Sequence, residues 1–290
     1  MQGLTCASAQ AADSSMPSGN IATNYLQSDL IHPDRLSSLL GETRQRFSLI
    51  ALAECTSTST LLLQQAREGA PSGTVIVADR QTAGRGSRGR AWSATPESGL
   101  MFSVLWGFPG GLECLSGLSL ATGVGVVEAL EGSGIAPITL KWPNDILYEN
   151  GKLGGILIEL HADEKQAMAV VGIGLNLRLP KHVSGNHAAA LPPAALEQIV
   201  PVLPDRHVLL ARLLVSLANT FDRFAAGGFA ALHDQWHAYH AWQNKKVRLL
   251  REGQPEQEGL CVGADMDGAL LVKTSNGIER CLSGEVSLRL

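Results

Sequence analysis

The sequence contains little that points to a disulfide framework or to a cysteine-bound metal. Its 290 residues include five cysteines, an odd number, and they are scattered without a Cys-x-x-Cys pair. This usage argues against a disulfide-stapled domain and against a zinc site built on cysteines, and it is typical of a reducing compartment. We therefore expect a cytoplasmic protein.

Long apolar stretches and an excess of positive charge are also missing. The most apolar stretch, residues 118–130, contains Ser, Thr, Gly and Glu, and is therefore unsuited to spanning a membrane. No basic segment followed by an apolar core stands at the N-terminus, as a secretion signal requires. The formal net charge of -4 gives no long-range attraction to nucleic acid, so such binding would need a local basic patch.

The beginning of the chain differs in composition from the rest. Residues 1–46 start with a stretch rich in Ser, Ala, Gln, Asn and Gly that has no periodicity. This composition predicts a mobile leader, followed by one short helix that begins after Pro33. The region is too short and too polar for an independent helix-turn-helix domain, which needs three helices around a core.

Residues 47–242 alternate between strand and helix signals. Helices are expected over 57–67, 113–130, 206–226 and 229–242, and four strand-like segments follow one another between 138 and 177. Glu149, Asn150 and Gly151 supply a hairpin turn inside that run. The pattern predicts an α+β fold, in which a mixed or antiparallel sheet packs on helices along one face.

Residues 243–290 break into short strands. Five strand-like segments are separated by turn signals such as Asp267-Gly268 and Asn276-Gly277. This spacing predicts a small C-terminal β-barrel of SH3 type.

The densest chemical signal is the loop 84–92, Gly-Arg-Gly-Ser-Arg-Gly-Arg-Ala-Trp, which follows a predicted strand. Its glycines allow a backbone to approach a ligand closely, and its arginines offer planar donors to phosphate or carboxylate. The loop is neither a Walker loop, since no Gly-Lys-Ser/Thr ends it, nor a Rossmann fingerprint. From these residues alone it is a phosphate-binding loop for an unknown partner or a solvated basic turn.

A second signal is the turn 141–145, Lys-Trp-Pro-Asn-Asp, between two predicted strands. A lysine at a strand end is fixed in direction, and its ammonium group can bind a phosphate as a point charge. Pro143 and Asn144 end the strand. The alternative is that Lys141 is a surface charge and Trp142 fills the core.

These two segments, together with Gly-Lys-Leu-Gly-Gly-Ile-Leu-Ile-Glu at 151–159 and Val-Gly-Ile-Gly-Leu-Asn at 171–176, closely resemble the biotin–protein ligase family. The resemblance keeps one order from Ser57 to Leu288 and includes Gly-Glu-Val-Ser-Leu-Arg at 284–289. It implies the class II synthetase-like biotin/lipoate ligase fold, with 47–242 as the catalytic biotin- and ATP-binding domain and 243–290 as the SH3-like domain.

The resemblance also implies the reaction and its partners. ATP and biotin form biotinyl-5′-AMP with Mg²⁺, and biotin passes to a lysine of a biotin carboxyl carrier protein or domain, such as that of acetyl-CoA carboxylase. Mg²⁺ is expected to be held mainly by the ATP phosphates, without protein ligands. Neither DNA nor a membrane is expected as a partner, and a homodimer is left open.

Site residues follow from the same resemblance. Ser57, Thr58 and Ser59 match a Ser-Thr-Asn segment that meets the ureido ring of biotin, and Gln81 lies beside biotin and the adenylate. Lys141 contacts the biotin carboxylate and the α-phosphate, and is expected to be catalytic together with Arg85. The other implied positions are the loop that closes over the adenylate, its lid tryptophan, the start of a pocket-lining strand and an asparagine near the ATP phosphates: Gly84, Arg85, Gly86, Ser87, Arg88, Trp92, Gly154, Gly155 and Asn176.

Two departures from the family pattern bear on binding. Ser87 stands where many members have a second arginine, so either Arg88 substitutes for it or the loop holds its adenylate less tightly. Ser59 stands where asparagine is usual, which affects one biotin contact.

Three alternatives remain beside this interpretation. A lipoate– or octanoate–protein ligase has a similar fold but lacks the loop and the turn in this form. A biotin repressor would carry an N-terminal winged helix, for which 1–46 is too short, so the ligase-only type is favoured. A nucleic-acid-binding module is disfavoured by the net charge.

His233, His237 and His240 resemble the zinc-protease pattern of histidines on one helix face. The general-base glutamate of that pattern is absent, so we expect an ordinary polar helix face.

Overall fold

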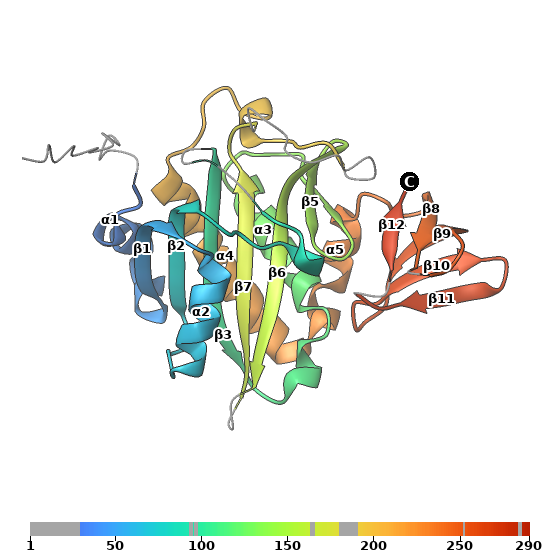
Figure 1. Ribbon diagram of the computed structural model, residues 1–290, viewed down its shortest axis with the longest axis horizontal. Helices are drawn as coiled ribbons and strands as arrows, with labels where there is room; N and C mark the ends of the chain where they lie inside the picture. The colour runs from blue at the N-terminus through green and yellow to red at the C-terminus, as the bar shows by residue number, and fades with distance from the viewer. Residues whose placement is uncertain are drawn as a thin grey trace, which may run out of the picture.

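The computed structural model describes residues 30–92, 95, 98–162, 166–179, 191–251, 253–283 and 286–290. Two sheets organise them (Figure 1). The larger sheet has seven strands in the order β1-β2-β3-β7-β6-β5-β4. Its strands are β1 (Ser48–Cys55), β2 (Thr74–Gln81), β3 (Gly99–Phe108), β4 (Thr139–Lys141), β5 (Asp145–Tyr148), β6 (Gly151–Ala162) and β7 (Ala167–Asn176).

The sheet is mixed, as expected. β1 and β2 run parallel, whereas every other neighbouring pair is antiparallel. The consecutive strands β4 to β7 form the meander that the sequence predicted, with Glu149 in a left-handed conformation at the turn between β5 and β6. The expected α+β fold is confirmed.

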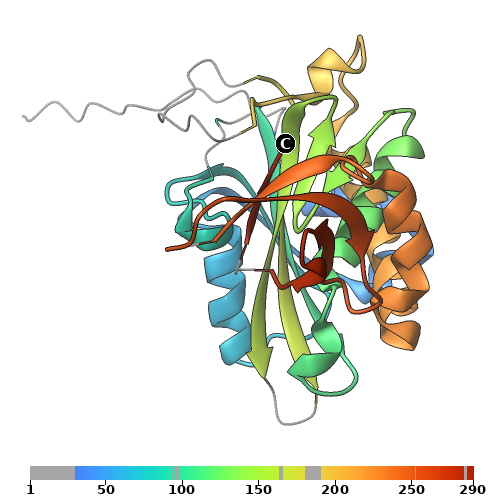
Figure 2. The same ribbon diagram turned by 90° about the vertical axis from the view of Figure 1, so that its right-hand side faces the viewer.

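Helices cover both faces of the sheet, not one. α3 (Leu118–Glu131) and α4 (Arg206–Gly227) pack on one face, and α2 (Thr58–Arg67) lies on the other (Figure 2). α2 finds an apolar surface there because the central strands are buried on both sides. Its residues Leu62 and Ala66 pack with Ile76, Leu105 and Val170 in a small second core.

Two predicted helices have different bounds in the structure. The helix expected at 113–130 begins only at Leu118, after the 3₁₀ helix Leu112–Leu115, because Gly117 adopts a left-handed conformation with φ of 77°. The helix expected at 229–242 is a 3₁₀ turn (Phe229–Leu232) followed by α5 (His233–Tyr239). It ends there because His240 is extended, and the Ala241 N–H bonds to the carbonyl of Leu140 on β4.

The N-terminal part of the described chain packs against α4. A helix, α1 (Pro33–Leu39), begins at Pro33 as expected and is followed by the 3₁₀ helix Gly41–Arg46. The predicted mobile leader, 1–29, lies outside the described residues. No helix within the described ranges is long and apolar enough to cross a membrane.

The second sheet is the predicted C-terminal unit. Its five antiparallel strands have the order β11-β10-β9-β8-β12 and enclose buried Leu249, Cys261, Leu270 and Val272. They are β8 (Lys246–Leu250), β9 (Gln257–Ala264), β10 (Leu270–Thr274), β11 (Gly277–Cys281) and β12 (Ser287–Arg289).

This sheet docks on α5 and on the turn after β4. His233 Nε2 and His237 Nε2 lie 3.0 and 3.1 Å from the carbonyl oxygen of Ala264, and Trp142 donates to the carbonyl of Gly268. The histidine face of α5 is therefore an internal contact surface and not the ordinary polar face that the sequence suggested. The contacts of the second sheet with α5 and Trp142 place β12 near the loop 84–92 and the turn 141–145 (Figure 1).

Candidate active site

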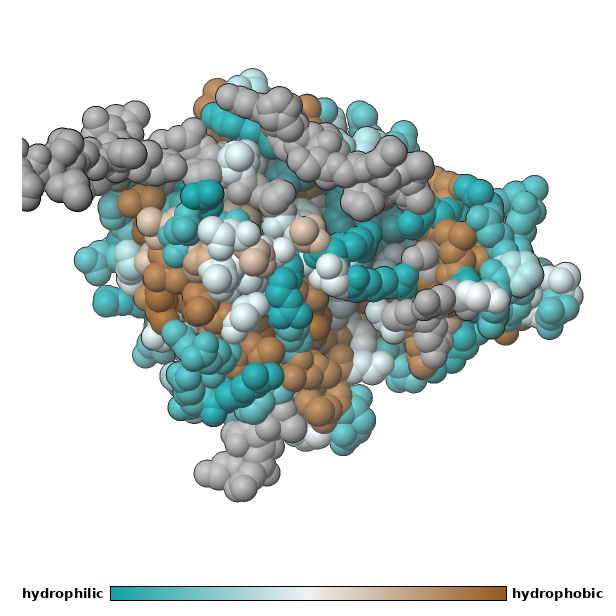
Figure 3. All heavy atoms as spheres, viewed as in Figure 1, coloured by the Kyte–Doolittle hydropathy of each residue, from teal (hydrophilic) through white to brown (hydrophobic). Residues whose placement is uncertain are grey.

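A cavity of about 410 Å³ opens on the face of the large sheet that α2 covers. The first turn of α2, the end of β2, the loop 84–92 and strands β6 and β7 surround it. Hydrophilic residues gather where the loop crosses this face (Figure 3). Among the residues that line it are Thr58, Ser59, Gln81, Trp92 and Gly174.

A second cavity of about 310 Å³ adjoins the first. Ser87, Arg90, Asn144, Ile156 and Leu157 line both cavities, so the two lie side by side at the loop and the turn. The rest of the lining of the second cavity includes the turn 141–145 and, from the C-terminal unit, Val286, Leu288 and Arg289. We call the two adjoining cavities together the hollow, and its two halves are built differently.

The loop 84–92 folds back on itself over the first cavity. The Gly86 N–H donates to Arg90 O at 2.7 Å, and the Trp92 N–H donates to Gly84 O at 2.9 Å. Gly84 is required by this fold, because a Cβ there would lie 2.2 Å from the Trp92 carbonyl oxygen. Arg88 adopts a left-handed conformation with φ of 59°, and its guanidinium donates to Val286 O in the C-terminal unit.

Trp92 closes one side of the first cavity. A Cβ on Gly174 would lie 2.5 Å from the indole ring, so the ring rests directly on the backbone of β7. The ammonium group of Lys152 lies 5.8 Å from the centre of the ring. Arg85, on the opposite limb of the loop, pairs with Glu159 of β6 at 2.8 Å.

Two lysines share one buried carboxylate where the two cavities meet the turn. Asp145 Oδ2 lies 2.9 Å from Lys141 Nζ, and its Oδ1 lies 2.5 Å from Lys152 Nζ. Burial lowers the pKa of Lys141, against the raising effect of Asp145. The pKa of Asp145 is also lowered: burial raises it, but the two ammonium groups outweigh that effect. The lysine ammonium groups are thus held in fixed positions.

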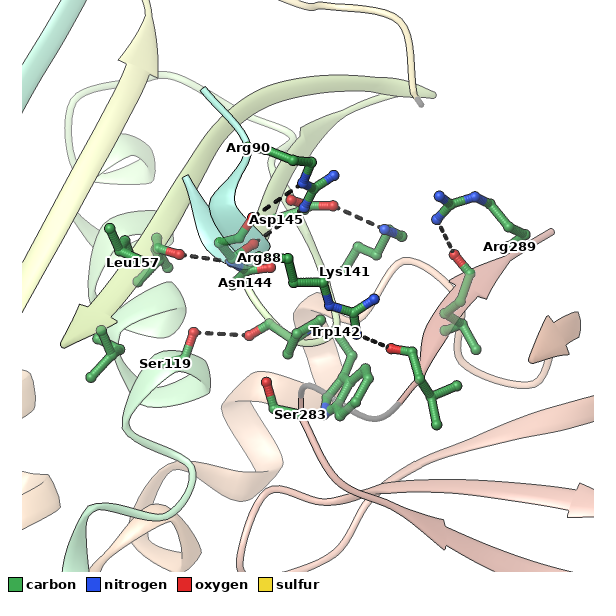
Figure 4. Close-up of a pocket in the computed structure, with 16 residues that line it drawn as sticks. Arg88, Arg90, Ser119, Lys141, Trp142, Asn144, Asp145, Leu157, Ser283 and Arg289 are labelled. Carbon is green, nitrogen blue, oxygen red and sulfur yellow. Dashed lines mark hydrogen bonds and ion pairs between the residues drawn. The ribbon is translucent and has the colours of Figure 1, made fainter. Parts of the chain in front are cut away.

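Arginines add further positive charge to the second cavity. Arg88, Arg90 and Arg289 come from the loop and from β12, and Figure 4 shows them around Lys141. Burial, followed by the charges of Arg90 and Arg88, lowers the pKa of Arg289. The Nε–H of Arg289 is buried and has no hydrogen-bond partner within the part of the chain that the structure describes. An anion would relieve both the crowding of charge and the missing hydrogen bond.

Hydroxyl and amide groups line the opposite end of the hollow. Gln81 Oε1 accepts the Thr58 N–H at 2.8 Å, and Thr58 Oγ1 lies 2.8 Å from Ser103 Oγ on β3. Ser59 Oγ lies 3.0 Å from the same Ser103 Oγ. This end offers neutral polar groups where the other offers cations.

The structure brings together most of the residues that the sequence singled out. The first cavity is lined by Thr58, Ser59, Gln81, Arg85, Gly86, Ser87, Trp92 and Gly155, and the second by Ser87, Arg88 and Lys141.

Four predicted residues support the walls of the hollow without lining them. Ser57 caps α2, since its Oγ accepts the Thr60 N–H. Asn176 donates to the carbonyls of Lys152 and Ala194. The other two are Gly84, whose backbone closes the loop, and Gly154, where a Cβ would lie 2.6 Å from a Leu175 methyl group.

Sequence reasoning missed several residues of the site. Lys152 stands inside the matched segment 151–159, and its charge was the signal that could have revealed it. Asp145 belongs to the matched turn, but only the structure shows it between two lysines. Arg289 ends the matched segment 284–289 but was given no role, and Ser103 carried no motif of its own. Among the described residues no group of three His, Cys, Asp or Glu is placed to hold a metal ion.

Comparison with known proteins agrees with this geometry. Residues 52–176 match the biotin/lipoate A/B protein ligase family, and residues 244–289 match the biotin protein ligase C-terminal domain. The chain is 32% identical to the bifunctional ligase/repressor BirA of Escherichia coli, over 83% of this chain and 74% of that protein. It is 34% identical to the biotin–[acetyl-CoA-carboxylase] ligase of Mycobacterium tuberculosis, over 87% of this chain and 97% of that protein.

A solved structure shares the architecture. The biotin protein ligase of Aquifex aeolicus, in complex with biotin and ATP, superimposes with a TM-score of 0.70 at 32% identity, covering 83% of this chain and 98% of that one. The chain belongs to the biotin protein ligase family. The family that the loop and the turn predicted is thereby confirmed, as is a biotin ligase in preference to a lipoate ligase.

Proposed function

We propose that this biotin protein ligase joins biotin to AMP in the two-part hollow and then passes biotin to a lysine of a biotin carboxyl carrier protein or domain. The observation that carries the proposal is a cavity with hydroxyl and amide groups at one end that adjoins a cationic cavity. The ring system of biotin fits the first half, and the phosphates of ATP suit the second. The carboxylate of biotin then lies at the junction, near Lys141 and Lys152.

The first step is a displacement at phosphorus. A carboxylate oxygen of biotin forms a bond to the α-phosphorus of ATP, the bond to the bridging oxygen breaks, and pyrophosphate leaves. Negative charge grows on oxygens beside Lys141 and Lys152, whose ammonium groups Asp145 already holds in place. Charges fixed in advance stabilise the transition state more than the ground state.

The second step needs no covalent bond to the enzyme. The amine of the carrier lysine attacks the acyl carbon of biotinyl-5′-AMP, AMP leaves, and one proton is released. The loop 84–92 covers the first cavity and keeps water from the mixed anhydride until the carrier arrives. Its contact between Arg88 and Val286 links that cover to the C-terminal unit.

Mg²⁺ fits this arrangement as a companion of the nucleotide. The carboxylate that lines the second cavity, Asp145, already pairs with two lysines. Mg²⁺ commonly binds through the phosphates of its nucleotide and a few waters. It would supply neutralisation of phosphate charge, while the lysines of this chain orient the reacting carboxylate.

The cellular setting forms a further part of the proposal. Cytoplasmic location is supported by the scattered, odd-numbered cysteines. Action without DNA is supported by the net charge of -4, and salt-resistant, sequence-specific binding in a gel shift with biotin and ATP would contradict it.

One assay tests the activity. The protein is incubated with ATP, Mg²⁺ and biotin, and pyrophosphate and AMP are measured, with lipoate and octanoate as competing acids. We expect pyrophosphate with biotin, and AMP once a carrier domain is added. Pyrophosphate release with lipoate but not with biotin would refute the proposal.

A further inference from the structure

A chain of four hydrogen-bonding groups ends at the floor of the first cavity. Ser59 and Thr58 line the cavity, whereas Ser103 lies behind them and is fully buried. Ser59 Oγ and Thr58 Oγ1 lie 3.0 and 2.8 Å from Ser103 Oγ, and Thr58 Oγ1 lies 3.3 Å from Gln81 Oε1. Ser103 is therefore the link between the two cavity hydroxyls.

The direction of the protons in this chain follows from its end at Gln81. The Thr58 N–H lies 2.8 Å from the Gln81 side chain, which requires the oxygen of the amide at that point. An amide oxygen only accepts, so the Thr58 hydroxyl donates to it. Ser103 must then donate to Thr58, and Ser59 must donate to Ser103. No other arrangement turns all three hydroxyl contacts into hydrogen bonds.

This direction decides what the cavity offers a ligand. The hydroxyl protons of Ser59 and Thr58 are donated to Ser103 and Gln81, so the two hydroxyls present only lone pairs to the cavity. Lone pairs at a cavity wall require N–H or O–H donors on the ligand. We propose that Ser103, without touching the ligand, makes the cavity specific for the N–H groups of a ureido ring by holding the proton of Ser59, as Gln81 holds that of Thr58. The inference rests on the proposed activation of biotin.

The strand register places a glycine where the Ser59 hydroxyl needs space. Ser103 of β3 pairs with Gly172 of β7, so the two residues are neighbours on the face beneath α2. A Cβ on Gly172 would lie 2.4 Å from Ser59 Oγ and 3.5 Å from Ser103 Oγ. Glycine at this position therefore makes room for the Ser59 hydroxyl and leaves the space in front of it to the cavity, which Gly172 also lines.

The consequence is discrimination against acids that carry no N–H group. The dithiolane ring of lipoate and the alkyl chain of octanoate would leave the lone pairs of Ser59 and Thr58 buried without a donor. Leaving one buried polar group unsatisfied weakens binding on the order of 10- to 100-fold. Sites built to bind a polar group reject analogues that lack it far more strongly than they reject an extra methylene.

Ser103→Ala tests the inference, because it removes the link without touching the cavity wall. We expect the biotin KM in pyrophosphate release, and the biotin Kd in calorimetry without ATP, to rise about tenfold. The ATP KM and kcat are expected to change less than about twofold. Ser103→Cys keeps a weak donor and acceptor at the same place and should fall between Ser103→Ala and the unmodified protein.

A second ligand separates proton ordering from a purely structural role. Biotin methylated on one ureido nitrogen lacks one N–H donor, and the unmodified protein should bind it on the order of 10- to 100-fold more weakly than biotin. In Ser103→Ala this penalty should shrink about fivefold or more, because the Ser59 hydroxyl is no longer fixed as an acceptor. A structural defect would weaken both ligands and leave their ratio unchanged.

The matched control is Thr122→Ala. Thr122 is also fully buried and donates to Leu118 O within α3, away from both cavities. It should leave the ratio of the two ligands unchanged. A Ser103→Ala ratio equal to that of the unmodified protein, or an unchanged biotin Kd, overturns the inference. Failure of the unmodified protein to release pyrophosphate with biotin would instead count against the proposed activity.

Discussion

Removing the charge of Lys141 is the most direct test of the cationic half of the hollow. Its ammonium group is buried, lies 2.9 Å from Asp145 Oδ2, and stands 5.0 Å from the ring centre of Trp242. Lys141→Met keeps the apolar stem and removes only the charge, whereas Lys141→Ala removes both. Lys152 continues to pair with Asp145 in either variant, so the carboxylate does not lose all its partners.

The expected size follows from the role of a positioned charge. One fixed donor or cation at a transition state commonly contributes about 10²- to 10³-fold in rate. We expect Lys141→Ala to slow adenylation by at least about 100-fold, which corresponds to about 2.7 kcal/mol. Lys141→Met should slow it by a similar factor. If loss of packing were the cause instead, Lys141→Met would retain much more activity than Lys141→Ala.

The assay is pyrophosphate release in a single turnover at saturating biotin and ATP, with melting temperatures measured in parallel. Lys246→Met is the control, because Lys246 is an exposed lysine on β8 that lines none of the cavities described above. It should react at the unmodified rate. A Lys141→Ala variant that releases pyrophosphate at nearly the unmodified rate would show that the lysine serves the fold alone.

Three further predictions follow from neighbouring contacts. Burial lowers the pKa of Lys141, so the rate of adenylation should fall as the pH rises through that lowered pKa and the ammonium group loses its charge. Lys141→Arg should move this fall to higher pH. Identical pH–rate profiles of Lys141→Arg and the unmodified protein would contradict the prediction. Ser87→Arg should slow escape of biotinyl-5′-AMP by roughly 10- to 100-fold through one added charged hydrogen bond, with little change in Arg88→Ala, whose arginine contacts Val286 O. Fast release from Arg88→Ala together with no effect of Ser87→Arg would mean that Arg88 already supplies the contact. Gly263→Ala should lower the melting temperature by several degrees, because φ is 113° and the new Cβ would lie 2.1 Å from His237 Cε1; an unchanged melting curve would refute that packing argument.

The sequence revealed those parts of the site that are contiguous in the chain. The loop 84–92 and the turn 141–145 concentrate charge and glycine in one stretch each, and both line the hollow. Lys152 was missed although it stands in a matched segment, because its partner Asp145 lies across the hairpin from it. The salt bridge depends on the pairing of β5 with β6, which includes a register shift between Ile146 and Leu147. Local pattern does not specify such a shift.

Helix bounds failed where tertiary contacts override periodicity. The apolar spacing of 113–130 continues through Gly117. In the structure, however, the chain packs closely against Phe229 at this point, since a Cβ on Gly117 would lie 2.6 Å from the Cβ of Phe229. The same holds for the second face of the sheet. The apolar residues of α2 indicated that the helix has a buried side. They did not show whether that side packs against other helices or, as it does, against Ile76 and Leu105 of the sheet.

The hydroxyl chain shows why a specificity element of this kind escapes a motif. Ser59, Ser103 and Gly172 are small, common residues on three elements that are far apart in the chain. None of them indicates a binding site by itself. They come together because the strand register pairs Ser103 with Gly172 and because the first turn of α2 places Ser59 over both. Their chemistry is then fixed by a single group at the end of the chain, the Gln81 oxygen that cannot donate. A residue that orders protons behind the wall of a cavity thus contributes to recognition without contact, and it becomes visible only when donors and acceptors are counted through to the last one.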